Sequence, residues 1–142
     1  MKPWSHLIIT LIVIAFYHPS LEFVIAFFLA GIFIDIDHIF DYLIFFKGKK
    51  SLRNFLFQEW WQYCRKVVLI FHGYEVLLLL FILLKIFGFE WLSGLFFGAL
   101  LHISLDVIFN VYVSEKGNKN PLVYSLFYRT LLGFETEQVK KS

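Results

Sequence analysis

Long apolar runs separated by short polar connections dominate the chain, and their lengths predict helices. A membrane-spanning helix needs about 20 apolar residues, within a range of about 17–25. The second, third and fourth runs meet this length, and the first, which ends at Pro19, is marginal. The four predicted segments are Trp4–Tyr17, Leu21–Phe46, Val67–Phe87 and Glu90–Val113.

A fifth apolar patch near the C-terminus, PLVYSLFYRTLLGF at Pro121–Phe134, is too short and too interrupted to span. Its mixture of Tyr, Phe and Arg is typical of a helix lying at a membrane interface. The pattern therefore predicts an all-α fold. We expect a polytopic membrane helical bundle of about four helices plus a C-terminal interfacial helix, as a single integral membrane domain over residues 1–142.

The composition changes the expected solvent from water to a bilayer. The chain is 59% hydrophobic and 17% charged, whereas a soluble domain is about 45–50% apolar and about 25% charged. A soluble fold of 142 residues could not bury so much apolar surface. The single cysteine, Cys64, excludes an internal disulfide and a cysteine-rich zinc site.

The distribution of basic residues predicts an orientation. The first connection has no Lys or Arg, and the third has only Lys85. Since cytoplasmic loops carry the Lys/Arg excess, we expect a multi-pass protein of the cell (inner) membrane with both termini cytoplasmic. The second connection, between the second and third runs, holds Lys47, Lys49, Lys50, Arg53, Arg65 and Lys66. This basic connection faces lipid headgroups in the simplest interpretation, and anionic substrate headgroups in the alternative.

Apart from Glu22 and Lys85, near the opposite ends of their runs, the ionisable residues inside the apolar runs lie at one depth. In an up-and-down bundle, the starts of the first and third runs meet the ends of the second and fourth. All of these residues then fall in the cytoplasmic half, whereas His18 falls on the opposite side and is expected to stay outside the cluster. The residues concerned are His6, Asp35, Asp37, His38, Asp41, His72, Glu75, His102 and Asp106.

Their spacing places most of them on common helix faces, because residues three or four apart share a face. Such pairs are Asp37 with Asp41, His38 with Asp41, His72 with Glu75, and His102 with Asp106. Asp35 is the exception, since it lies about 200° around an ideal helix from Asp37. Both can face one site only if the helix is irregular there, or if Asp35 serves a different role.

A divalent metal would explain this concentration of charge. An aspartate near mid-membrane costs roughly 2.5–3.5 kcal/mol on insertion scales, and the runs offer almost no Lys or Arg as partners. Carboxylates and imidazoles are natural ligands for zinc, the first candidate, as one or two ions. Glu75 or Asp41 would be the general base. The candidate ligands are His6, Asp35, Asp37, His38, His72, His102 and Asp106.

Four short motifs also resemble a known family in order and rough spacing, over about the first 110 residues. They are SHL at Ser5–Leu7, IDIDH at Ile34–His38, FHG at Phe71–Gly73 and GALLHISLD at Gly98–Asp106. They resemble the membrane-bound metal-dependent hydrolase family, the YdjM-like inner-membrane proteins. Ile34 stands where that family has proline, and the family's second histidine upstream of His72 is missing, with Glu75 one turn downstream instead.

The resemblance implies a polytopic membrane protein with a His/Asp metal centre and hydrolase chemistry. The family is distantly similar to zinc-dependent phospholipase C, which points to a phosphoester or lipid-like substrate. By motif match, the ligand role passes to His6, Asp37, His38, His72, His102 and Asp106.

Three functions are consistent with the residues. The first is a hydrolase using metal-activated water at the cytoplasmic side, with membrane lipids as partners, no nucleic acid, and an oligomer left open. The second is proton or metal-ion handling by the same cluster, although the outer halves of the runs carry no polar trail beyond Glu22. The third is a structural staple between helices.

Overall fold

The computed structural model of the chain describes residues 3–17, 20–57, 64–114 and 119–137. Within these ranges the protein is helical, with two isolated antiparallel bridges and no strand, so the predicted all-α class is confirmed for the described residues. His18 and residues 58–63 of the basic connection lie outside them.

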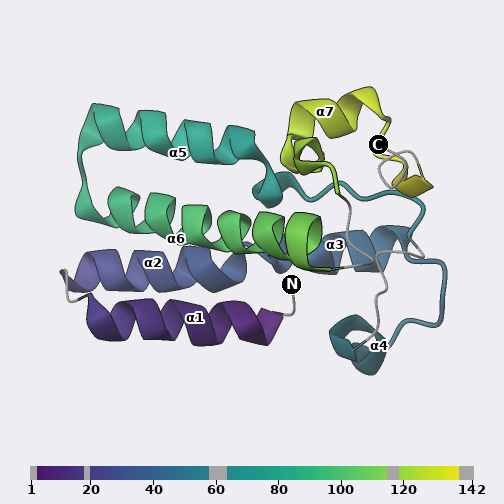
Figure 1. Cartoon of the computed structure of the whole chain (residues 1–142), viewed down its shortest axis with the longest axis horizontal. Coiled ribbons are helices and arrows are strands. Elements are labelled where there is room, and N and C mark those ends of the chain that lie inside the picture. Colours follow the sequence, from purple (N-terminus) through teal and green to yellow (C-terminus); the bar gives the residue numbers. More distant parts are fainter. Residues whose placement is uncertain (1–2, 18–19, 58–63, 115–118, 138–142) are drawn as a thin grey trace.

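Four helices lie side by side and roughly antiparallel in one half of the molecule (Figure 1). They are α1 (Pro3–Phe16), α2 (Leu21–Phe33), α5 (Tyr74–Phe87) and α6 (Glu90–Val107). α6 packs along α2 and also contacts α1 and α5. The starts of α1 and α5 and the ends of α2 and α6 point toward the same end of this group (Figure 1), as the up-and-down pattern predicts.

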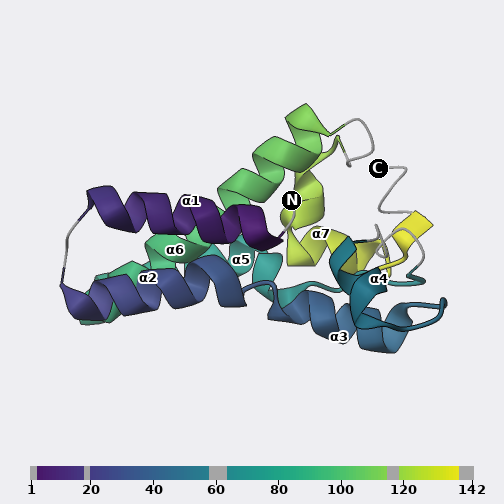
Figure 2. The same cartoon turned by 90° about the horizontal axis from the view of Figure 1, so that it is seen from below.

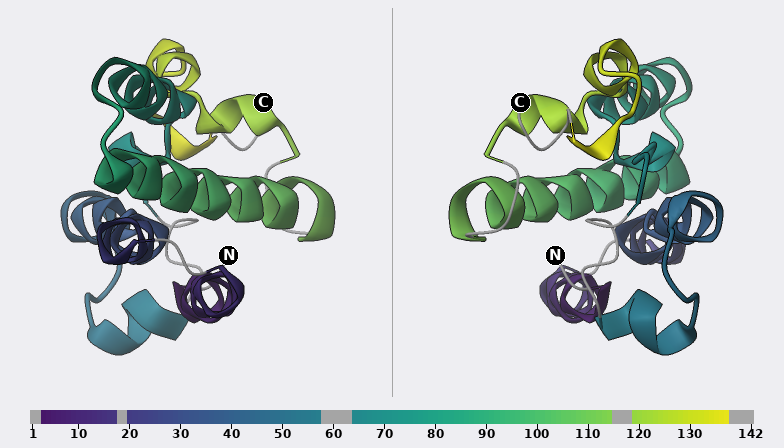
Figure 3. Two further views of the ribbon diagram at one scale, coloured as in Figure 1. Left: turned by 90° about the vertical axis from the view of Figure 1, so that its left-hand side faces the viewer. Right: turned by 90° about the vertical axis from the view of Figure 1, so that its right-hand side faces the viewer.

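Shorter elements gather beyond that end. α3 continues from the end of α2, while α4 and α7 lie nearby (Figure 2). In the end-on views, α6 crosses the middle, with α5 and α7 on one side and α1, α2 and α4 on the other (Figure 3). The short elements are α3 (Ile36–Phe45), α4 (Leu52–Phe57), η2 (Ile70–His72), the π-helix η3 (Ile108–Val113), η4 (Pro121–Tyr124) and α7 (Leu126–Leu131).

The second predicted run is not one continuous helix. α2 ends at Phe33, and a turn at Ile34 and Asp35 precedes α3. The turn supplies the irregularity that the offset between Asp35 and Asp37 requires, because it changes the direction of Asp35 relative to α3. Both aspartates can therefore reach the same neighbour.

The prediction of a helix over the whole third run is wrong. α5 begins only at Tyr74 and has 14 residues, because the backbone amides of Val67, Val68, Leu69 and Phe71 bond to groups outside the segment. At 1.5 Å per residue, α5 is about 21 Å long, short of the roughly 30 Å of a hydrocarbon core. α1 is equally short, with 14 residues.

Among the residues that the structure describes, two helices remain long and apolar enough to cross a membrane: Leu21–Phe45, counted through its turn, and Glu90–Val113. The predicted C-terminal interfacial helix over 121–134 is instead two short helices, η4 and α7, separated at Ser125. Their apolar residues divide between two environments. Tyr124 is buried, whereas Leu122 and Phe127 are exposed.

Two glycines on α6 allow its backbone to approach α2 closely. A Cβ atom added at Gly98 would lie 2.5 Å from the carbonyl oxygen of Phe27, and one added at Gly94 would meet the carbonyl of Phe23. Small residues at such spacing permit close contact between helix backbones. The approach brings His102, one turn after Gly98, against the end of α2.

Candidate metal centre

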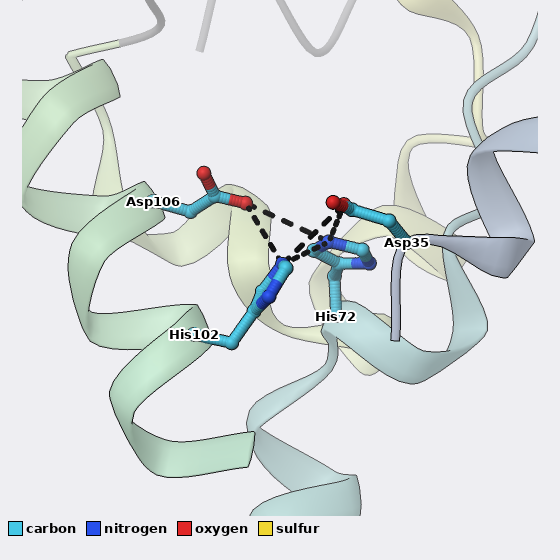
Figure 4. A group of neighbouring side chains, drawn as sticks. All are labelled: Asp35, His72, His102 and Asp106. Carbon is cyan, nitrogen blue, oxygen red and sulfur yellow. Dashed lines mark hydrogen bonds and ion pairs between the residues drawn. The ribbon is translucent and has the colours of Figure 1, made fainter. Parts of the chain in front are cut away.

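Four buried or half-buried side chains converge where these elements meet (Figure 4). Asp35 comes from the turn between α2 and α3, His72 ends η2, and His102 and Asp106 lie one turn apart on α6. The Nε2 atoms of His72 and His102 are 3.2 Å apart. Oδ1 of Asp35 lies 3.3 Å and 3.4 Å from these two nitrogens, and Oδ2 of Asp106 lies 3.6 Å from each.

These separations suit a tetrahedral ion. The edge of a regular tetrahedron is about 1.63 times the distance from its centre to a corner, so edges of 3.2–3.6 Å correspond to metal–ligand distances of about 2.0–2.2 Å. Zinc binds histidine nitrogen at about 2.0–2.1 Å and carboxylate oxygen at about 2.0–2.2 Å. The four ligand atoms all lie within 4.8 Å of one another.

The hydrogen-bond partner of His102 fixes which of its two ring nitrogens presents a lone pair to the centre. Its Nδ1 lies 2.9 Å from the carbonyl oxygen of Gly31. Because a carbonyl oxygen can only accept, Nδ1 carries the hydrogen and Nε2 is left as an acceptor in the neutral ring. The α2–α6 contact thus prepares His102 as a metal ligand.

His72 is prepared in the same way by a carboxylate. Its Nδ1 lies 3.0 Å from Oδ1 and 3.1 Å from Oδ2 of Asp37, and Oδ2 also accepts a hydrogen bond of 2.9 Å from the amide of Phe71. Nδ1 therefore donates, and Nε2 faces the centre. A metal-binding histidine typically gives its other N–H to a carboxylate or carbonyl in this manner. Asp37, predicted as a ligand, occupies this supporting position.

His6 lies outside both groups of converging side chains, although its motif predicted it as a metal ligand. Its Nε2 is 3.1 Å from Oδ1 of Asp106, and its ring stacks on His102 with centroids 3.9 Å apart. The other oxygen of Asp106 faces the cluster. His6 therefore positions Asp106 in this structure, with its own Nδ1 buried and lacking a hydrogen-bond partner among the described residues.

His38 marks the accessible edge of the cluster. Its Nε2 lies 3.4 Å from Oδ1 of Asp35, and the two side chains are 26% and 17% exposed, whereas those of His72, His102 and Asp106 are at most 5% exposed. Asp37, His38 and His72 form a second group able to hold an ion. Since this group shares His72 with the first, the residues fit one ion better than two.

The two predicted general bases, Asp41 and Glu75, belong to neither group of ligands. Oδ2 of Asp41 accepts from the amides of Val68 and Leu69, at 2.7 Å and 3.2 Å. The Glu75 carboxylate accepts three hydrogen bonds from the C-terminal segment. Their donors are the Ser125 hydroxyl and the amides of Leu126 and Phe127, at 2.6, 2.8 and 3.0 Å. Backbone amides need acceptors once they are buried, so these carboxylates stabilise a loop and a helix start.

The sequence prediction missed Arg129. This residue of α7 is only 2% exposed, and its Nη2 donates to the carbonyl oxygen of Leu69 at 2.9 Å. Burial lowers the pKa of its guanidinium, while the carboxylates of Asp37 and Glu75 act in the opposite direction. Its place as the single Arg in an apolar patch is the signal that could have indicated a buried cation.

Asp37→Asn should weaken the binding of a metal ion at this centre by roughly 10–100-fold, the usual cost of losing a supporting partner of a metal ligand. The amide retains one oxygen for the Phe71 amide, but it is a poorer acceptor for the Nδ1–H of His72. Competition titration with a chromophoric chelator would measure the change. Asn54→Ala, in α4 and outside both groups of candidate ligands, is the control, and equal affinities of the two variants would contradict the supporting role of Asp37.

Comparisons with known proteins add no assignment to this geometry. No family model matches the chain, and no curated protein or solved structure matches it either.

Proposed function

We propose that the protein is a membrane-embedded, metal-dependent hydrolase that acts on a phosphoester or lipid-like substrate. One observation carries the proposal: the Nε2 lone pairs of His72 and His102 face each other at 3.2 Å, with two carboxylate oxygens beside them. Four electron-pair donors so close repel one another unless a cation or a shared proton lies between them. The donor set of two imidazoles and two carboxylates suits zinc.

The distribution of apolar surface supports the membrane setting. Only 28% and 39% of the most apolar stretches of Leu21–Phe45 and Glu90–Val113 are buried inside the structure, whereas the core helix of a soluble protein is mostly buried. Large exposed apolar residues also cover α1 and α5, among them Ile12, Phe16, Leu78 and Ile86. So much contiguous apolar surface would be unstable in water and would be covered by lipid.

The accessible edge at Asp35 and His38 favours catalysis over a purely structural site. Structural zinc is enclosed by four protein ligands, whereas catalytic zinc keeps a position for water or substrate. Since four side chains converge here, water or substrate would have to reach the ion at the Asp35 edge, as a fifth ligand or in place of the Asp35 oxygen. A bound zinc ion would supply Lewis-acid chemistry and lower the pKa of water to about 7. His38, next to Asp35 at the edge, would take up or deliver a proton there, while Asp37 and His6 hold the ligands in orientation.

The surroundings of that edge suit an amphipathic, anionic substrate. α3 exposes Ile36, Phe40 and Ile44, and the connection after it exposes several basic residues, including Lys47 and Arg53. Apolar surface beside basic residues is the chemistry that recognises an acyl chain next to a phosphate headgroup. The motif resemblance to membrane-bound metal-dependent hydrolases supports the same substrate class.

Metal analysis and activity assays test the proposal together. Detergent-purified protein should contain about one zinc, manganese or iron ion per chain and should hydrolyse a phosphodiester or a phospholipid in mixed micelles. Absence of bound metal after reconstitution with all three ions would overturn the proposal. Metal binding without hydrolysis of any phosphoester would instead favour ion handling by the same residues.

A further inference from the structure

The backbone that carries His72 is not held by regular secondary structure. Residues 67–69 belong to no helix or strand, η2 provides a single turn, and Leu69 has φ 44° and ψ 63°, in the left-handed region. A non-glycine residue there is strained and persists only where its surroundings impose it. The contacts on either side of His72 therefore decide where its ring lies.

Upstream of His72, the C-terminal segment 121–136 binds the chain at several points. The amide of Val67 donates to the carbonyl of Phe134 at 3.0 Å, and the amide of Thr136 donates to the carbonyl of Arg65 at 3.2 Å. Arg129 donates to the carbonyl of the strained residue itself, Leu69. These bonds fix the stretch that leads into η2.

Downstream of His72, the same segment binds the first turn of α5. The hydroxyl of Tyr74 donates to the carbonyl of Pro121 at 2.9 Å. Glu75 accepts from the Ser125 hydroxyl and from the first amides of α7, where a carboxylate is also favoured by the helix dipole. His72 thus lies between two stretches that are both attached to one C-terminal segment.

We propose that segment 121–136 is a clamp that sets the position of the His72 imidazole in the metal centre, with Arg129 and Glu75 as its positioning residues. The consequence for metal binding rests on the proposed function, whereas the clamp itself does not. The clamp explains why a guanidinium is buried in a segment whose sequence predicts an interfacial helix. It also explains why the loop that carries His72 keeps a strained backbone.

Hydrogen exchange on metal-free, full-length protein in detergent tests the clamp by itself. Arg129→Ala should accelerate exchange of the amides of Val68, Leu69 and Phe71, and Arg129→Lys should do so less. Glu75→Gln should act in the same direction from the other side of His72, and it replaces Arg129→Ala if that variant does not fold. Arg53→Ala, which removes an exposed arginine, is the control.

Cobalt titration then tests the consequence for the metal centre. Arg129→Ala and Glu75→Gln should weaken Co²⁺ binding by roughly 10–100-fold. They should also change the visible d–d spectrum at saturation, which depends on ligand geometry and not on overall stability. Arg129→Lys should restore part of both properties.

The outcomes separate the clamp from the proposed function. Exchange rates in Arg129→Ala equal to those in Arg53→Ala would overturn the clamp. Faster exchange with an unchanged Co²⁺ spectrum and affinity would overturn the positioning of His72. If the unaltered protein binds no metal but exchange still rises in Arg129→Ala, the clamp stands and the metal-dependent function fails.

Discussion

His102→Ala should abolish stoichiometric metal binding, with a loss larger than the roughly 10–100-fold expected for a supporting residue. The substitution removes one of four converging ligand atoms and also the hydrogen bond from Nδ1 to Gly31. Only Asp35, His72 and Asp106 would then remain of the four candidate ligands. Elemental analysis after gel filtration in detergent would measure the change.

His18→Ala is the matched control for His102→Ala. His18 follows α1 in the sequence, whereas His6 lies near the start of that helix, so an alanine there should leave the metal content unchanged. His72→Ala should reproduce the loss from a different element. Retention of a full equivalent of metal in both His72→Ala and His102→Ala, with unchanged helical content by circular dichroism, would contradict the site.

Gly98→Val should destabilise the protein and remove the metal at the same time. Its side chain would collide with the carbonyl of Phe27 and the side chain of Ala30, and overpacking of this kind typically costs about 1–3 kcal/mol, occasionally more. Since the contact lies on backbone atoms, relief requires α6 to move away from α2. That movement would break the hydrogen bond from His102 to Gly31. Thermal unfolding in detergent and metal content are the two measurements.

Leu100→Phe is the control for this effect, because it adds volume on the same helix at a position that faces outward. It should leave both the melting temperature and the metal content close to those of the unaltered protein. Gly98→Ala should fall between the two, since its single methyl group still meets the Phe27 carbonyl. A melting temperature of Gly98→Val no lower than that of Leu100→Phe would show that the α2–α6 contact is looser than described.

The prediction of a His/Asp cluster able to hold a metal is confirmed, and it came from local information. His102 and Asp106 are four residues apart on a continuous helix, so their shared face follows from helix geometry alone. The up-and-down order of apolar runs then placed His72 and the end of the second run at the same level. Zinc, hydrolysis and the membrane orientation remain predictions.

The roles of individual ligands could not be derived from the sequence. Asp35 and Asp37 were both candidate ligands, and Asp35 was the one whose position on an ideal helix did not fit. In the structure Asp35 faces both Nε2 atoms and Asp37 supports Nδ1 of His72. The difference depends on the turn at Ile34 and Asp35. That turn changes which aspartate reaches the centre, and nothing in the apolar pattern of the run indicates where it falls.

Composition and helix periodicity are local properties, so they were enough to predict the helical class, the apolar surface and the set of side chains from which a metal centre could form. How the segment before α5 folds, and which carboxylates accept from the backbone, depend on distant contacts. The amides of residues 67–69 and 71 bond to Asp37, Asp41 and Phe134 instead of continuing the helix. These acceptors come from distant parts of the chain, as does Arg129, so only the folded arrangement brings them to His72.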